Sequence, residues 1–186
     1  MNLLIAGIAL WTIAHFFKRL APGMRASMTA KMGNGSKGIM ALLIVASIVM
    51  MVFGYRAAPI EIVYDLPSFT RHINNTLMII SVILLGMGNS KGRARTWLRH
   101  PMLWGVVVWS GAHLLVNGDV ASIVLFGGLG IWALANMMLI NVQDGAWEKP
   151  EAGPAKGDIK LLIISAVVFA VISGLHIWLG PNPFGG

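Results

Sequence analysis

Six long apolar runs, separated by short polar connections, constrain the fold of this chain more than any other feature. Apolar residues make up 56% of the 186 residues and charged residues only 11%, whereas a soluble domain carries about a quarter charged residues. A helix needs about 20 apolar residues to cross a bilayer. We therefore predict an all-α, polytopic membrane helix bundle that forms a single domain over residues 1–186. The expected spans, about six, are residues 2–20, 37–55, 72–88, 101–116, 121–142 and 159–179.

The basic residues fall almost entirely in alternate connections between these runs. Twelve of the 14 Lys and Arg residues lie in the first, third and fifth connections: Lys18, Arg19, Arg25, Lys31, Lys37, Lys91, Arg93, Arg95, Arg99, Lys149, Lys156 and Lys160. Because Lys and Arg concentrate in cytoplasmic loops, both termini are predicted to face the periplasm. The first run is retained as a span, since its basic pair follows it instead of preceding it as in a signal peptide. This distribution also argues against nucleic-acid binding, despite the net charge of +7.

Several kinds of chemistry are excluded or disfavoured by what the runs lack. The chain has no cysteine, which excludes disulfides, cysteine-bound zinc and thiolate catalysis. Zinc and di-iron sites need clustered carboxylates and histidines, and ion-coupled transport normally needs acids within the membrane. The apolar runs contain almost no carboxylates, and Asp119 is expected to belong to a turn, Asn117-Gly118-Asp119, between the fourth and fifth spans. No internal sequence repeat is evident.

Histidines are the most informative polar residues within the runs. His15, His113 and His176 lie inside three different predicted spans, while His72 and His100 lie at span ends. An ionisable ring inside the hydrocarbon region is costly, so each buried histidine is a candidate functional residue. At a rise of about 1.5 Å per residue, His113 lies near or slightly beyond the bilayer centre.

Two interpretations of these histidines remain open. In the first, two imidazoles on facing helices bind a b-type haem as axial ligands, and nearby glycines and aromatic rings accommodate the macrocycle. In the second, each ring hydrogen-bonds a carbonyl or hydroxyl of a neighbouring helix, with Thr12, Ser110 and Ser173 as candidate partners. At the predicted cytoplasmic rim, Arg99 and His100 are expected to pair with haem propionates or lipid phosphates.

The segment from Arg99 to Asp119 resembles the NnrU family of bacterial membrane proteins. The resemblance rests on Arg99-His100-Pro101, Ala112-His113-Leu114-Leu115, Asn117-Gly118-Asp119, Phe126-Gly127-Gly128, Leu175-His176 with Trp178, and His15 in an aromatic-rich first run. It implies an inner-membrane protein associated with denitrification, that is, with nitrite and nitric oxide reduction. NnrU proteins are similar to plant zeta-carotene isomerase, which holds haem b through two histidines. That similarity implies His15 and His113 as metal ligands, with His176 in reserve.

The opening Arg99-His100-Pro101 is also similar to membrane methyltransferases of the isoprenylcysteine carboxyl type. Those enzymes carry an acid-containing aromatic segment after the last helix pair, of which this chain has only residues 144–148. The sequence thus favours a haem-binding protein with a redox or isomerase-like step in nitrogen-oxide respiration, and it leaves open whether the chain is an enzyme. The alternative is an accessory or assembly subunit without a cofactor. Its expected partners are the bilayer and a respiratory or other membrane-protein complex.

Overall fold

The computed structural model describes residues 1–180 and 182–184, and within them the secondary structure is helical apart from one isolated bridge between Ile62 and Asp119. The chain divides into two compact units. The first unit consists of residues 1–63 and 119–128, and the second consists of residues 64–118 and 129–186. The predicted all-helical class is confirmed.

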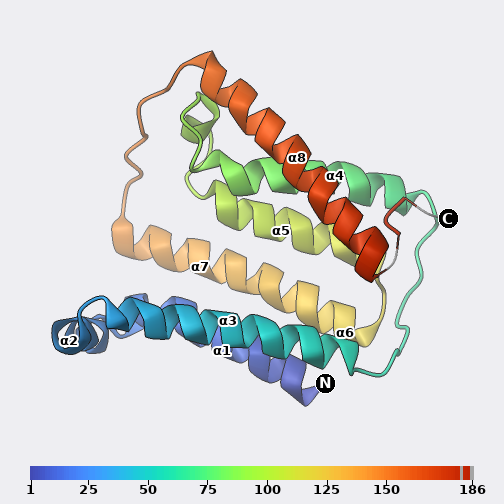
Figure 1. Ribbon diagram of the computed structural model, residues 1–186, viewed down its shortest axis with the longest axis horizontal. Helices are drawn as coiled ribbons and strands as arrows, with labels where there is room; N and C mark the ends of the chain where they lie inside the picture. Colours follow the sequence, from blue (N-terminus) through green and yellow to red (C-terminus); the bar gives the residue numbers. More distant parts are fainter. Residues whose placement is uncertain (181, 185–186) are drawn as a thin grey trace. The chain divides into compact units, whose positions relative to one another are not determined.

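The first unit is built on an antiparallel pair of long helices, α1 (Asn2–Leu20) and α3 (Gly35–Arg56) (Figure 1). Their backbones approach closely because glycines lie at the contact: a Cβ built on Gly7 would lie 2.8 Å from Met51 Cγ, and one on Gly54 would lie 2.7 Å from Leu4 Cα. A third helix, α2 (Pro22–Met32), joins the two and has no counterpart among the predicted elements. It could not be predicted as a span, because it contains no long apolar run.

The second unit is built on α4 (Thr70–Met87), which contacts both α5 (Pro101–Leu114) and α8 (Ala155–Leu179) (Figure 1). The buried hydroxyl of Ser81 in α4 donates a 2.8 Å hydrogen bond to the carbonyl oxygen of Gly105 in α5. Leu84 of α4 and Leu161 of α8 belong to the buried apolar cluster of this unit. These contacts fix the neighbours of the helix that carries His113.

A loop between α4 and α5, which includes the short helix η1 (Ala94–Thr96), is bound to the start of α8. The backbone N–H of Ala94 donates to Asp158 Oδ1 at 3.0 Å, and the N–H of Gly153 donates to the carbonyl oxygen of Gly92 at 3.1 Å. A side chain at Gly92 or at Gly153 would overlap the facing backbone. The basic loop is therefore an ordered structure with a defined partner.

The fifth apolar run forms one helical stretch, Val120–Asp144, composed of α6 (Val120–Ser122), a π-helical turn η2 (Ile123–Gly127) and α7 (Gly128–Asp144). The side chain of Asp119 caps it by accepting the N–H of Ser122 at 2.9 Å, as an N-cap aspartate should. The boundary between the two units falls directly after Gly128. A π-helical turn is a common mark of a functional or adjustable point in a helix.

Among the residues that the structure describes, four helices are long and apolar enough to cross a membrane, judged by length and composition: α1, α3, the Val120–Asp144 stretch and α8. Their bounds agree with the predicted first, second, fifth and sixth spans to within a few residues. The predicted third and fourth spans exist as α4 and α5, but they are not among these four. Helix α5 has 14 residues, about 21 Å at the α-helical rise, which is short for a span.

Candidate functional site

The three histidines predicted within the apolar runs share one local geometry. Each ring places Nδ1 within hydrogen-bond distance of the carbonyl oxygen four residues earlier in its own helix: His15 to Trp11 (2.8 Å), His113 to Trp109 (2.9 Å) and His176 to Ile172 (2.8 Å). A carbonyl oxygen only accepts, so Nδ1 carries the proton in the neutral ring and Nε2 carries the lone pair. Metal-bound histidines commonly use this arrangement, with one nitrogen on the metal and the other donating to a carbonyl.

Two of the three histidines also share an aromatic neighbour. The ring centroids of Trp11 and His15 in α1 lie 4.1 Å apart, and those of Trp109 and His113 in α5 lie 5.0 Å apart. In both helices the same tryptophan supplies the carbonyl and the ring. His176 has an isoleucine in the corresponding position, so it does not repeat this arrangement.

The likeness between α1 and α5 extends over nine residues. Residues 7–15 read Gly-Ile-Ala-Leu-Trp-Thr-Ile-Ala-His, and residues 105–113 read Gly-Val-Val-Val-Trp-Ser-Gly-Ala-His. The two segments therefore share five positions at identical spacing: glycine, tryptophan, a small hydroxyl residue, alanine and histidine. The glycines also have equivalent roles, because a Cβ on Gly7 would crowd Met51, and one on Gly105 would lie 3.1 Å from the backbone nitrogen of Leu85.

The partner helices repeat as well. Helix α3 carries Ser47, Met51 and Gly54. The same spacing recurs in Ser81 and Leu85 of α4 and in Gly88, the residue that directly follows α4. Both serines are fully buried. Gly54 faces Leu4 near the start of α1, and Gly88 faces Pro101 at the start of α5.

Each unit thus contains an antiparallel helix pair with a glycine at the contact and a histidine eight residues after it. The serines differ, because Ser47 donates to Ile44 in its own helix whereas Ser81 donates across to Gly105. The two pairs share a short motif. In the first unit the histidine helix precedes its partner, whereas in the second unit it follows its partner. The opposite chain order means that the partner helices do not align together with the nine-residue motif.

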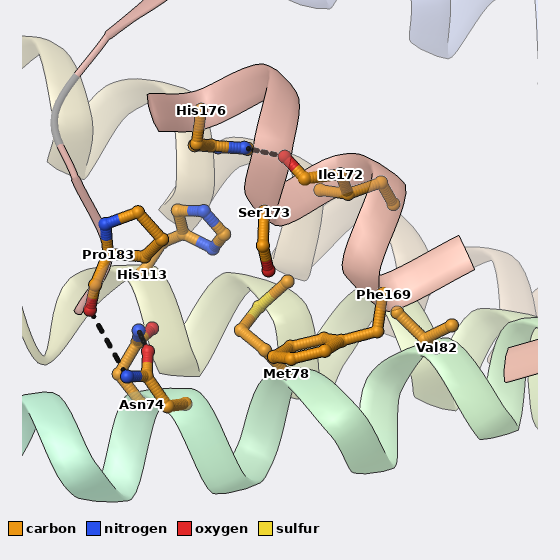
Figure 2. A pocket seen from close by; sticks show the side chains of 10 residues that line it. Asn74, Met78, Val82, His113, Phe169, Ile172, Ser173, His176 and Pro183 are labelled. Carbon is orange, nitrogen blue, oxygen red and sulfur yellow. Dashed lines mark hydrogen bonds between the residues drawn. The ribbon is translucent and has the colours of Figure 1, made fainter. Parts of the chain in front are cut away.

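His113 and His176 line one small cavity of the second unit (Figure 2). The cavity has a volume of about 50 Å³, room for a few water molecules and too small for a haem macrocycle. It is lined by residues from α4, α5, α8 and the C-terminal segment: Asn74, Asn75, Met78, Val82, His113, Phe169, Ile172, Ser173, His176 and Pro183. Of the residues that line the cavity, only His113 and His176 were predicted as site residues, although the Asn74-Asn75 pair inside an apolar run was an available signal.

The amide of Asn74 gives this cavity a polar wall. Asn74 Nδ2 donates to Asn75 Oδ1 at 2.9 Å, and Asn75 Nδ2 donates to the carbonyl oxygen of Pro183 at 3.1 Å. Asn74 Oδ1 is buried and has no hydrogen-bond partner among the described residues. Since a buried amide oxygen normally accepts a hydrogen bond, the cavity suits a water molecule or another small donor.

Arg99 and His100, predicted to bind propionates or phosphates, have protein partners at the end of α7. Arg99 Nη1 donates to the carbonyl oxygen of Gly145 at 2.6 Å, and His100 Nε2 lies 2.8 Å from Asn141 Oδ1. Both interactions are solvent-exposed. They connect the start of α5 to the end of α7 within the second unit.

The family model described as NnrU protein matches residues 3–183. The chain belongs to the NnrU family. This confirms the resemblance noted from the sequence, and the match covers nearly the whole chain, including both copies of the histidine motif. No curated protein and no solved structure matches this NnrU family member.

The donor set of this NnrU family member suits some metal centres and not others. Within residues 1–180 and 182–184, no group of three or more His, Cys, Asp or Glu side chains could hold a metal ion. A b-type haem needs only two axial ligands, and imidazole Nε2 atoms are suitable ones. The Nδ1 bonds described above leave the lone pair on Nε2 in the neutral rings of His15, His113 and His176, so the donor chemistry of these residues fits haem ligation.

Proposed function

We propose that this NnrU family member is a six-span bacterial inner-membrane protein that binds haem b through His15 and His113 and supports nitrogen-oxide respiration. Both termini face the periplasm in this proposal, and residues 1–186 act as one functional domain. The haem would supply a one-electron redox centre. His176 is the reserve ligand.

The repeated histidine motif is the observation that carries the proposal. A b-type haem would be held by two imidazole side chains, and a matched pair of histidines is the simplest candidate for them. His15 and His113 are matched in tautomer, in tryptophan contact and in distance from the close-packed glycine of their helix. His176 shares only the tautomer, so the matched pair is favoured over the pair that lines the cavity.

The chain's own groups perform three tasks in this proposal. The Trp11 and Trp109 carbonyls orient the imidazoles and increase the electron density at Nε2 by accepting the Nδ1 proton. The two indole rings limit rotation of the imidazoles. The apolar helices limit the access of water to the ligands.

The proposed topology includes α4 and α5 as the third and fourth spans. The first, third and fifth connections hold 12 of the 14 Lys and Arg residues. These connections all lie on the cytoplasmic side, as the positive-inside rule requires, only if both α4 and α5 cross the membrane. A reporter enzyme fused within residues 89–99 tests this directly. Cytoplasmic activity there is expected, and periplasmic activity would overturn the six-span arrangement.

The visible spectrum of the protein, purified in detergent from cells supplied with haem, tests ligation. We expect a Soret band and sharp α and β bands on reduction. His15→Ala and His113→Ala should each convert the low-spin spectrum to a high-spin one or abolish it. His72→Ala, a substitution at an exposed helix start, is the matched control and should leave the spectrum unchanged.

Two results would contradict this assignment. A colourless wild-type protein would favour the accessory or assembly subunit without a cofactor. A spectrum lost in His113→Ala and His176→Ala but retained in His15→Ala would move the second ligand to α8. The respiratory role is tested separately, by nitrite and nitric oxide consumption in a denitrifying host that carries only the His15→Ala or His113→Ala protein.

A further inference from the structure

Helix α2 has an apolar face that the first unit leaves exposed. Met24, Met28 and Met32 recur every four residues and so form one stripe along α2, which we call the methionine stripe. Met24 is 64% exposed and Met32 is 47% exposed. Exposed apolar side chains on the four membrane-length helices would contact lipid. Helix α2 is not one of those helices, so the exposure of its methionine stripe needs a separate explanation.

The charges of α2 are arranged around this stripe. With 3.6 residues per turn, Arg25 lies on one flank of the stripe and Lys31 on the other. The opposite face carries the small residues Ala26 and Ala30, both exposed. Residues 1–60 contain six Lys and Arg residues and no Asp or Glu, so the whole region around α2 is positive.

The orientation of α2 within the first unit agrees with this pattern. Figure 1 shows α2 end-on beside the C-terminal end of α1 and the N-terminal end of α3, both of which run across the view. Helix α2 therefore lies crosswise to the two helices. If α1 and α3 cross a bilayer, α2 lies along its surface.

We propose that α2 binds the surface of the bilayer as an interfacial helix that selects anionic phospholipids. The methionine stripe enters the border between headgroups and acyl chains, while Arg25 and Lys31 extend to lipid phosphates on either side. A short helix with apolar and basic residues arranged in this way is typical of interfacial binding, and Lys and Arg near the surface are attracted to anionic lipids. The proposal rests on α1 and α3 spanning the membrane, as in the proposed function, and is independent of haem.

Site-directed spin labelling tests the proposal, because the chain has no native cysteine. Single cysteines are introduced by Met24→Cys in the stripe and by Ala30→Cys on the opposite face as matched control. Val45→Cys, at an exposed position in the middle of α3, reports whether that helix is in the membrane. The full-length protein is reconstituted into vesicles of phosphatidylcholine, with or without phosphatidylglycerol, and the label's accessibility to oxygen and to a water-soluble nickel complex is measured.

In vesicles with phosphatidylglycerol, the ratio of oxygen to nickel accessibility is expected to be several-fold higher at position 24 than at position 30. A ratio at position 24 as low as that at position 30 would overturn the proposal. Protection of position 24 from both reagents would also overturn it, because a protein partner or a second copy would then cover the stripe. If the label at position 45 has a low ratio of oxygen to nickel accessibility, as in water, then α3 does not span the membrane. That result would overturn the proposed topology.

The selectivity for anionic lipid has its own measurement. Each Lys or Arg side chain near an anionic surface strengthens binding a little more than about fivefold. Loss of two such side chains in the double variant Arg25→Gln/Lys31→Gln should therefore reduce insertion about 30-fold. In this double variant, a label at position 24 should give the same ratio of oxygen to nickel accessibility with and without phosphatidylglycerol. Lys37→Gln, beyond the end of α2, is the control and should preserve most of the difference. Equal ratios for the parent protein in both lipids would refute the selectivity.

Discussion

The phenolic hydroxyl of Tyr64 donates a 2.6 Å hydrogen bond to the carbonyl oxygen of Leu114, at the C-terminal end of the helix that carries His113. The last carbonyls of a helix have no partner within the helix, and Tyr64 supplies one. Its backbone N–H also donates to the carbonyl oxygen of Gly118 at 3.2 Å. Tyr64 therefore holds the end of α5 and the turn that follows it.

Tyr64→Phe should lower the stability of the second unit. The substitution keeps the ring and removes the hydroxyl that donates to the carbonyl oxygens of Leu114 and, at 3.3 Å, of Asn117, which costs about 1 kcal/mol. The melting temperature in detergent, followed by circular dichroism, should fall by a few degrees. Trp178→Phe, at a 78% exposed position, is the control, and equal melting temperatures for Tyr64→Phe and the parent would refute this role.

The close contact between α1 and α3 should not tolerate a methyl group. Gly54→Ala places Cβ against the backbone of Leu4, so the helices must separate, and such overpacking costs about 1–3 kcal/mol. Gly111→Ala is the matched control in α5, because a Cβ there meets no atom within 4 Å. The control should be neutral or slightly stabilising, since alanine favours helix over glycine. Equal unfolding temperatures for the two variants would contradict the predicted helix contact.

Asp119 should make the stability of the α6 cap depend on acid pH. Burial tends to raise the pKa of Asp119, but hydrogen bonds from the Ser122 hydroxyl and from backbone amides outweigh it, so the pKa is lowered. A carboxyl with a lowered pKa in the folded state stabilises that state above its unfolded pKa. The stabilisation is lost as pH falls through the folded value, below about pH 4.

We therefore expect Asp119→Ala to cost about 1 kcal/mol at neutral pH, as loss of an N-cap does, and to lose less stability than the parent on acidification. Thermal unfolding between pH 3 and pH 7 (about the range over which a carboxyl titrates) measures both effects. Asp65→Ala, at an exposed loop position, is the control. Parallel pH profiles for Asp119→Ala and the parent would show that the cap does not titrate as described.

The contact between Asp158 and the basic loop should protect that loop from proteolysis. Asp158→Ala removes the acceptor for the Ala94 N–H, and local opening exposes Arg93 and Arg95 to trypsin. Cleavage at these residues in detergent should be several-fold faster than in the parent. Glu151→Ala, in an exposed segment, should cleave at the parental rate. Unchanged cleavage of Asp158→Ala would mean that the glycine contacts alone hold the loop.

Helix α1 shows how much of the fold could be predicted from local sequence. Its bounds, Asn2–Leu20, coincide with the predicted first span, because a run of apolar residues ended by a basic pair is a purely local signal. Helix α2 could not be predicted in the same way, since its stripe of three methionines is visible only once the segment is known to be helical. Asn74 was likewise passed over: its place inside an apolar run was a local signal, but the cavity that it lines is formed by segments distant in sequence.

The amino-acid sequence by itself determined the helical membrane class, the family and the three candidate histidines, since apolarity, charge and motif spacing are properties of the linear chain. It also contains the matched motif around His15 and His113, but it did not determine which helix packs against each motif: Gly7 lies against Ser47 and Met51, while Gly105 lies against Leu85 and accepts the hydrogen bond of Ser81. Only the tertiary structure decides which helices pair, because close packing of two helices depends on residues that are distant in sequence. Here the histidine helix precedes its partner in one unit and follows it in the other.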